Sequence, residues 1–298
     1  MSPVSRSSAG GRAFLELQKR AKASGRNTQE LLDLYTLEGF LARLAISDVR
    51  DRFVLKGGVL LAAFGNRRPT RDVDLAGQSI SSEPASVLAM ITTVVDVEPP
   101  DDDGITFRSE SATSEVIRDE DEYSGVRISI DAQIATARIR FHIDVNLGDP
   151  IVPRPTMVSV PRLIGGEPIR LWGYPLHMVL AEKIVTAVQR GVANTRWRDF
   201  GDIWTLTQDH EVAGSDLQHA IREVARHRRA ELVPLADVLD GYAALAQSRW
   251  VAWRRRNNRA DLPLQFGDVI TQVITFAEPP LTGDLDGGTW SPHDQEWR

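Results

Sequence analysis

Cysteine is absent from the 298 residues of the sequence. Its absence excludes disulfides and thiolate metal sites and is typical of proteins that fold in a reducing cytosol. No apolar run approaches the ~20 residues that a membrane-spanning helix needs. The first residues, MSPVSRSSAGGRAF, also lack the apolar core of a signal peptide. We therefore expect a cytoplasmic protein that makes no membrane contact.

The sequence also has little that points to covalent catalysis. No group of residues resembles a nucleophilic triad, so any group transfer is expected to be direct. The histidines do not recur at metal-ligand spacing, so we expect structural or surface roles for His142, His177, His210 and His227.

Charge is unevenly distributed, although the net charge is only −6. Acidic residues are dense between positions 96 and 122, and basic residues are dense between 222 and 259. A negative net charge does not by itself suggest a nucleic-acid partner. The average nevertheless hides a basic C-terminal third, which is where a polyanion would bind.

Apolar spacing predicts an α+β fold, with a small mixed sheet in the first half and helices in the second. The expected strands are residues 53–56, 72–76, 126–134, 137–148 and 168–172. The expected helical regions are 11–50, 59–64, 82–95, 174–191, 197–208 and 215–257. We expect an α/β domain over 1–172 and a helical domain over 173–277. Residues 278–298 are polar and rich in glycine and proline, which predicts a flexible tail.

Two aspartates in the segment DVDLA form the first candidate site. Asp72 and Asp74 flank Val73, and residues two apart on a strand point to the same face. Like charges this close are costly unless a cation lies between them, and Mg²⁺ prefers such oxygen ligands. Asp144, in FHIDVNL, would join them if its strand paired antiparallel with DVDLA. Three such acids can hold two metal ions about 4 Å apart.

A candidate phosphate-binding turn precedes these acids. Lys56, Gly57 and Gly58 follow an apolar strand and open a helix, and glycine lets backbone amides approach an anion closely. The loop that follows carries three arginines able to reach phosphates, Arg67, Arg68 and Arg71. Taken alone, the turn is more simply a tight turn, and each aspartate is more simply a solvated strand residue. Their order along the chain indicates one site.

The motifs GG, RPTRDVDL and FHIDV resemble the signature of polymerase-β-type nucleotidyltransferases. More narrowly, LKGGVLLAAFGNRRPTRDVDL, LAEKIVTAVQRG and RWRDFGDIWTL resemble the AbiEii/MenT toxins of bacterial toxin–antitoxin systems, over about residues 50–206. The resemblance implies a polymerase-β-like core, use of an NTP (ATP, CTP, GTP or UTP), dependence on Mg²⁺, and growth arrest when the antitoxin partner is missing. In related toxins the acceptor is the 3′ end of tRNA, and the added nucleotides block aminoacylation and hence translation.

The resemblance also assigns residues. It implies that Asp72 and Asp74 bind metal and that Lys183, in AEK, is needed for activity. It makes Asp202 the functional acid of RDFGD, with Asp199 structural. Thr70 matches a Ser/Thr that some antitoxins of the family phosphorylate, and a phosphate beside the acids would oppose NTP binding.

One departure from the broader family concerns the turn. Many members have Gly-Ser there, with the serine touching phosphate, whereas this chain has Gly57-Gly58. Backbone amides would have to replace that serine.

The helical residues have physical support and also plainer explanations. Lys183 lies near the apolar side of its helix, where it could reach a triphosphate, or it could be a surface lysine with a buried stem. Asp199 and Asp202 are three residues apart and so share a helix face. They could equally form salt bridges with Arg196 or Arg198.

Basic residues with interleaved tryptophans suggest an RNA acceptor. In a helix Arg249, Trp253 and Arg256 fall on one stripe, where arginines would neutralise phosphates and an indole would stack on a base. Packing of Trp250 and Trp253 on the core is the equal alternative. Our leading hypothesis is a toxin that transfers NMP to RNA. The alternatives are a nucleotidyltransferase acting on an antibiotic or a protein hydroxyl, and a non-catalytic binding module.

Overall fold

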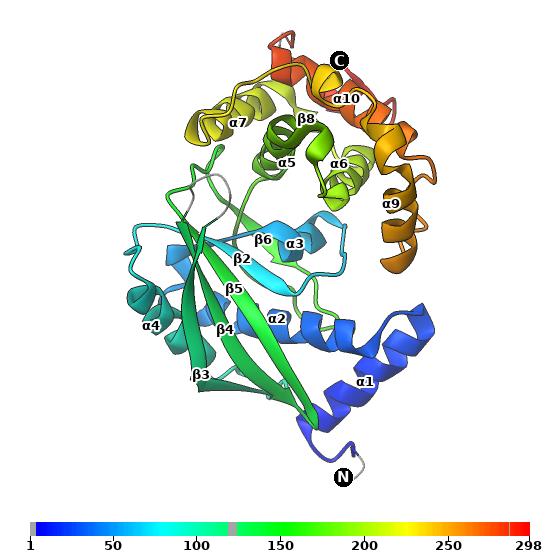
Figure 1. Ribbon diagram of the computed structural model, residues 1–298. Coiled ribbons are helices and arrows are strands. Elements are labelled where there is room, and N and C mark those ends of the chain that lie inside the picture. Colours follow the sequence, from blue (N-terminus) through cyan, green and yellow to red (C-terminus); the bar gives the residue numbers. More distant parts are fainter. Residues whose placement is uncertain (1–3, 119–123, 286) are drawn as a thin grey trace. The chain divides into compact units, whose positions relative to one another are not determined.

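The computed structural model describes residues 4–118, 124–285 and 287–298 (Figure 1). The acidic residues 119–122 noted in the sequence lie outside this part. The chain forms two compact units. The first comprises the residues up to Gly148 together with Thr156–Gly173, and the second comprises Asp149–Pro155 together with Tyr174–Arg298.

The first unit is built on a mixed sheet that, in the described residues, has the strand order β3-β4-β5-β2-β1-β7-β6. The strands are β1 Phe53–Lys56, β2 Asp72–Gly77, β3 Ile105–Arg118, β4 Ser124–Ile134, β5 Ala137–Leu147, β6 Thr156–Val160 and β7 Ile169–Gly173. Strands β3, β4 and β5 form an antiparallel meander, β1 is antiparallel to β2, and β2 is parallel to β5.

Helices cover one face of this sheet. They are α1 Ala9–Ser24, α2 Thr28–Ile46 and α4 Pro84–Val95. The single turn α3 Gly57–Leu60 lies on the other face, beside Asp74, and 3-10 turns occur at Arg50–Arg52 and Leu61–Phe64. Helix α2 packs on β5 and β7, and α4 packs on β3. Leu37, Phe40 and Leu41 of α2 are fully buried, and each such side chain stabilises the fold by about 1.5–3 kcal/mol. The other face of β2 and β5 carries polar side chains and is bordered by α3.

Local sequence explains where the first two helices begin and end. Ser8 caps α1 by accepting a hydrogen bond from the Gly11 N–H (3.1 Å), and Asn27 caps α2 by accepting one from the Gln29 N–H (2.8 Å). Gly25, in the left-handed region, ends α1. The helical region expected over 11–50 is therefore two helices, because this glycine interrupts it.

Two other expectations for the first unit are corrected. The pairing of β2 with β5 is parallel, whereas the sequence analysis expected it to be antiparallel. The helix expected over 59–64 is a single α-helical turn followed by a 3-10 turn. So short a helix has little macrodipole, and its contribution to phosphate binding is correspondingly small.

The second unit is mainly helical. Its helices are α5 Leu176–Arg190, α6 Trp197–Asp209, α7 Gly214–His227, α8 Leu235–Val238, α9 Tyr242–Arg256 and α10 Phe266–Thr282, with a 3-10 turn at Gly191–Ala193. An aromatic cluster joins three of them. Phe200 of α6 and Tyr242 of α9 each pack edge-on against Phe266 of α10, and Trp250 stacks on Phe266 at 4.7 Å. None of the helices in the described part of the chain combines the length and the apolar character needed to cross a bilayer.

The flexible tail expected over 278–298 is not what the structure shows for 278–285 and 287–298. Helix α10 continues through Pro279 to Thr282, and β8 Val212–Ala213, β9 Thr289–Ser291 and β10 Glu296–Trp297 form a small sheet. Trp290 is fully buried, packs edge-on against Phe276 at 5.0 Å, and donates its indole N–H to the Thr207 carbonyl (2.9 Å). Tryptophan burial fixes a segment whose polar composition suggested disorder.

Candidate active site

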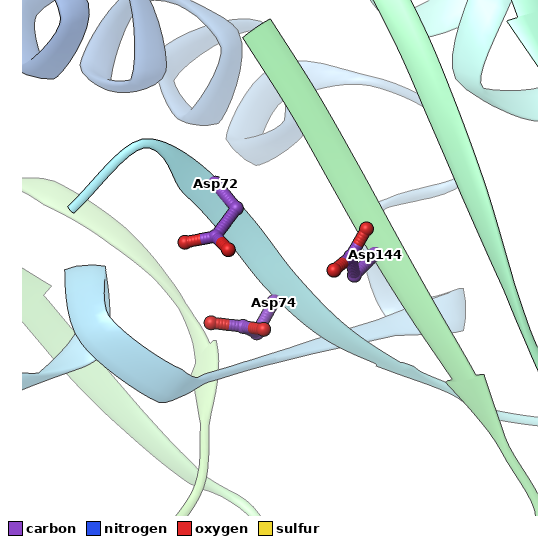
Figure 2. A group of neighbouring side chains, drawn as sticks. All are labelled: Asp72, Asp74 and Asp144. Atoms are coloured by element: carbon purple, nitrogen blue, oxygen red, sulfur yellow. The ribbon is translucent and has the colours of Figure 1, made fainter. Parts of the chain in front are cut away.

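Three carboxylates meet on the face of the sheet that carries α3. Asp72 and Asp74 alternate along β2 with buried Val73 between them, and Asp74 lies directly opposite Asp144 in the β2–β5 ladder. One oxygen from each acid lies within 4.8 Å of the others. Figure 2 shows the three side chains leaving adjacent strands on the same side. The expected clustering of these acids is thus present, even though the strand direction was wrong.

The charges of these acids oppose one another. The pKa of Asp74 is raised to about 6, first by burial and then by the neighbouring charge of Asp72, with a smaller effect from Asp144. The ammonium of Lys56, directly opposite Asp74 on β1, acts in the other direction, as does the Gly58 N–H at 3.4 Å. A group of acids that resists full ionisation is well suited to a divalent cation, which would relieve the repulsion.

The donor set fits Mg²⁺. It consists of carboxylate oxygens from two rigid, adjacent strands, and Mg²⁺ prefers a few carboxylates together with water and substrate phosphates. Asp72, Asp74 and Asp144 are the residues that would hold it.

Gly57 is required by the geometry of this site. Its φ is +65°, in the left-handed region, and a Cβ there would lie 1.8 Å from Oδ2 of Asp74. The turn can therefore pass close to the acids only because residue 57 has no side chain.

Replacing Gly57 with alanine is expected to destabilise the protein by more than the about 1–2 kcal/mol that a left-handed L-residue costs. The added methyl group would also displace the Asp74 carboxylate, so Mn²⁺ affinity should fall. Gly65→Ala is the matched control, since Gly65 also has a positive φ (+79°) but a Cβ there meets nothing within 4 Å. Denaturant unfolding and Mn²⁺ titration measure both effects. Equal behaviour of the two variants would contradict the assigned role of Gly57.

Thr70 fills the space beside the second glycine. Its hydroxyl donates to Oδ1 of Asp72 at 2.8 Å, and the residue is only 9% exposed. A Cβ at Gly58 would lie 2.7 Å from that hydroxyl oxygen. The hydroxyl of Thr70, in the loop before β2, therefore occupies space that a side chain at position 58 would need.

The arginines expected to reach phosphates have different surroundings. Arg67 forms a salt bridge with the buried Glu38 at 2.5 Å and also donates to the Pro161 carbonyl. These bonds tie the loop to α2, which favours a structural role. Arg68 is buried, whereas Arg71 is exposed next to the acids in sequence.

Asp144 has a partner that the sequence analysis did not identify. Arg127 of β4 donates from Nε to Oδ1 and from Nη2 to Oδ2, both at 2.7 Å. The hydrogen bond and the charge of Asp144 raise the pKa of Arg127 further above its usual range. The sequence does indicate this pair. A short connection joins β4 and β5, and Arg127 and Asp144 lie at equal distances along the chain from it, which places them opposite each other.

A second charged cluster lies in the helical unit. The Lys183 ammonium of α5 donates to Oδ1 of Asp199 (2.8 Å) and to Oδ2 of Asp202 (2.7 Å), and Arg196 Nε pairs with Asp199 at 2.7 Å. Asp202 is fully buried. Burial acts to raise the pKa of Asp199, but Lys183 and Arg196 outweigh it and hold the pKa well below its usual range. The cluster brings together Lys183 and Asp202, and the ion pair of Asp199 with Arg196 is one of the alternatives that the sequence left open.

The tryptophans of the basic helix pack inward. Trp250 is fully buried and donates its indole N–H to the Pro263 carbonyl (3.0 Å), and Trp253 stacks on it at 5.2 Å. Core packing, one of the two alternatives from the sequence, is thus confirmed for Trp250. The exposed side chains on this helix include Arg249 and Arg256.

Comparisons with known proteins found one family model and several similar structures. A family model described as the nucleotidyl transferase AbiEii toxin of a type IV toxin–antitoxin system matches residues 39–272. The chain is similar in structure to the nucleotidyltransferase toxin MenT4 of Mycobacterium tuberculosis, with 16% identity, a TM-score of 0.50, and coverage of 92% of this chain and 98% of that one. It is also similar to JHP933 of Helicobacter pylori, with 12% identity, a TM-score of 0.50, and coverage of 87% and 95%. At such identities these structures confirm the expected fold and no more. No curated protein matches the chain.

Proposed function

Because the chain belongs to the AbiEii family of nucleotidyltransferase toxins, we propose that it transfers a nucleoside monophosphate from an NTP to an RNA acceptor, first of all the 3′ end of tRNA, and so blocks translation. The observation that carries the proposal is the acid cluster of Asp72, Asp74 and Asp144 beside the Gly57-Gly58 turn. We place this activity in the cytoplasm, where NTP and tRNA occur together.

The chain's own residues would divide the work as follows. Asp72, Asp74 and Asp144 hold Mg²⁺, which when bound supplies positive charge for the triphosphate and for the attacking hydroxyl. Lys56, buried beside Asp74, limits the repulsion among the acids. Thr70 orients Asp72 through its hydroxyl, and the absence of side chains at Gly57 and Gly58 leaves the acids room.

Transfer is then a direct displacement. The acceptor hydroxyl oxygen forms a bond to the α-phosphorus and gives its proton to solvent water, while the bond from the α-phosphorus to pyrophosphate breaks. We assign Arg71, exposed in the loop before β2, to the phosphates. Arg67 is the weaker candidate for that role because Glu38 already engages it.

Lys183 and Asp202 are proposed to act in transfer as a pair. An ammonium has three N–H donors, and the bonds to Asp199 and Asp202 use two of them. We assign the third N–H donor of Lys183 to a phosphate oxygen, with Asp202 holding the lysine in place.

The RNA acceptor is supported by exposed arginines rather than by stacked indoles. Arg249, Arg255 and Arg256 are exposed on α9, and arginines at a surface neutralise a phosphate backbone. Family membership implies an antitoxin partner. We propose Thr70 as the residue on which a kinase-type antitoxin would act, since a phosphate there would add negative charge next to Asp72.

A transfer assay tests the proposal. The purified protein is incubated with each labelled NTP in turn, Mg²⁺ and total tRNA, in parallel with the Asp72→Ala variant and with EDTA. Label is expected on RNA with the wild type and in neither control. Label found only on protein, or only on an added antibiotic, would replace RNA with that acceptor. Unchanged growth arrest by Asp72→Ala would indicate a non-catalytic module.

A further inference from the structure

A row of charged residues crosses the sheet at the acid cluster. The strand ladders place Glu115 of β3 opposite Arg127 of β4, Arg127 opposite Asp144 of β5, Asp144 opposite Asp74 of β2, and Asp74 opposite Lys56 of β1. The two metal-binding acids in this row are therefore flanked on both sides by a basic residue. The positively charged side chains of Arg127 and Lys56 therefore adjoin the acids before any metal binds.

The two flanking cations are not equivalent. Lys56 is buried next to the acid that lies in the centre of the cluster. Arg127 forms a bidentate ion pair with Asp144, with both bonds at 2.7 Å, and its side chain is 33% exposed while that of Asp144 is 10% exposed. Paired hydrogen bonds of this kind are among the strongest that side chains form. They engage both oxygens of the acid that completes the metal site.

We infer that Arg127 is a positioning residue that occupies Asp144 and thereby limits how tightly the nucleotide-free site binds a divalent cation. A cation approaching Asp144 competes with the guanidinium for the same two oxygens and is repelled by its charge. The inference rests on the proposed metal site, since it concerns the same three acids. Arg127 would weaken metal binding while no nucleotide is bound, so that metal loading depends more on the metal-binding phosphates of the nucleotide.

A purely structural role predicts something different. Arg140 and Asp131 form another ion pair between β4 and β5, at 2.9 Å, with side chains 49% and 45% exposed. If Arg127 only stabilised the strand pair, its loss would resemble the loss of Arg140 and would leave metal affinity unchanged. Arg140 thus provides a matched control on the same two strands.

The test is Mn²⁺ binding by the full chain without nucleotide, after removal of metal with EDTA, followed by the EPR signal of free Mn²⁺. Arg127→Met is expected to bind Mn²⁺ about tenfold more tightly, because a unit charge about 6 Å from a divalent ion in water-like surroundings corresponds to roughly that factor. Arg127→Gln, which keeps a hydrogen-bond donor without the charge, should show the same tightening and serves if the methionine variant folds poorly. Arg127→Lys and Arg140→Met should remain within about twofold of wild type.

Thermal unfolding gives a second readout. In EDTA, Arg127→Met should melt below wild type, because it leaves Asp144 without its counter-ion, and Mn²⁺ should raise its Tm by more than it raises that of wild type. Unchanged or weaker Mn²⁺ binding by both Arg127→Met and Arg127→Gln would overturn the inference, as would equal tightening in Arg140→Met. Failure of the proposed function would instead appear as absent label transfer by the wild type, a measurement independent of these titrations.

Discussion

Asp74→Asn is expected to lower nucleotidyl transfer by at least about a hundredfold while leaving the protein folded. Loss of one fixed electrostatic group at a reaction centre commonly costs 10²–10³ in rate, and Asp74 lies at the centre of the three acids, opposite Asp144 and one residue removed from Asp72. The amide retains the size and one oxygen of the side chain but not its charge. Transfer of labelled NMP to RNA measures the effect.

The same variant should be more stable than wild type when metal is absent. The pKa of Asp74 rises from 3.8 to about 6 on folding, so the folded state prefers the protonated acid. The stability associated with that preference is present below pH 4 and is lost as the pH rises through about 6. At pH 7.5 in EDTA, Asp74→Asn should therefore exceed wild type by about 1–2 kcal/mol, a value reduced because the carboxylate is partly exposed. The difference should disappear near pH 4.

When metal is present, the wild type should be more stable than Asp74→Asn. Mg²⁺ or Mn²⁺ should stabilise the wild type and have little effect on Asp74→Asn, because binding to the folded state alone raises the free energy of unfolding. Asp131→Asn changes an acid on the same sheet outside the cluster and should match wild type in transfer and in metal response. If Asp74→Asn kept more than about a tenth of the activity, the acid cluster could not be the catalytic centre.

The positions of the acids could be predicted from the sequence because strand geometry is local. Asp72 and Asp74 share a face whatever lies beside them, and buried Val73 marks the opposite face. The direction of the neighbouring strand could not be predicted. Apolar and polar residues alternate in the same way in parallel and antiparallel strand pairs. In addition, α4, β3 and β4 lie between β2 and β5 in the chain.

Arg127 was predictable in principle but was not found. Its strand and that of Asp144 were both expected, and a hairpin with a short connection fixes which residues face one another.

Whether some side chains are buried depends on residues distant in sequence, and sequence patterns do not reveal those contacts. Trp250 and Trp253 occupy a helix whose arginines suggested an exposed stripe, but Phe266 of α10 stacks on Trp250 and Trp253 packs behind it. In the same way Trp290 is buried against Phe276, although glycine and aspartate dominate its neighbourhood. Composition describes the surroundings of such a residue in the chain, whereas burial depends on residues far from it in sequence.

Lys183→Met is expected to destabilise the protein by about 3–5 kcal/mol, the usual cost of removing one member of a buried ion pair. The lysine is the counter-ion of Asp199 and of the fully buried Asp202, with bonds of 2.8 and 2.7 Å. Arg196 remains paired with Asp199 in this variant. Urea unfolding measures it. Arg226→Met, which breaks the exposed pair with Glu223, should change stability by no more than about 1 kcal/mol.

A double variant separates folding from chemistry in this cluster. Lys183→Met combined with Asp202→Asn removes both members of the pair and leaves Asp199 bonded to Arg196, so most of the lost stability should return. Transfer should nevertheless remain absent, because the ammonium proposed to serve the triphosphate is gone. If the double variant regained transfer together with stability, Lys183 and Asp202 would be needed only to neutralise each other. The chemistry would then depend on the acid cluster of the sheet, without help from these two residues.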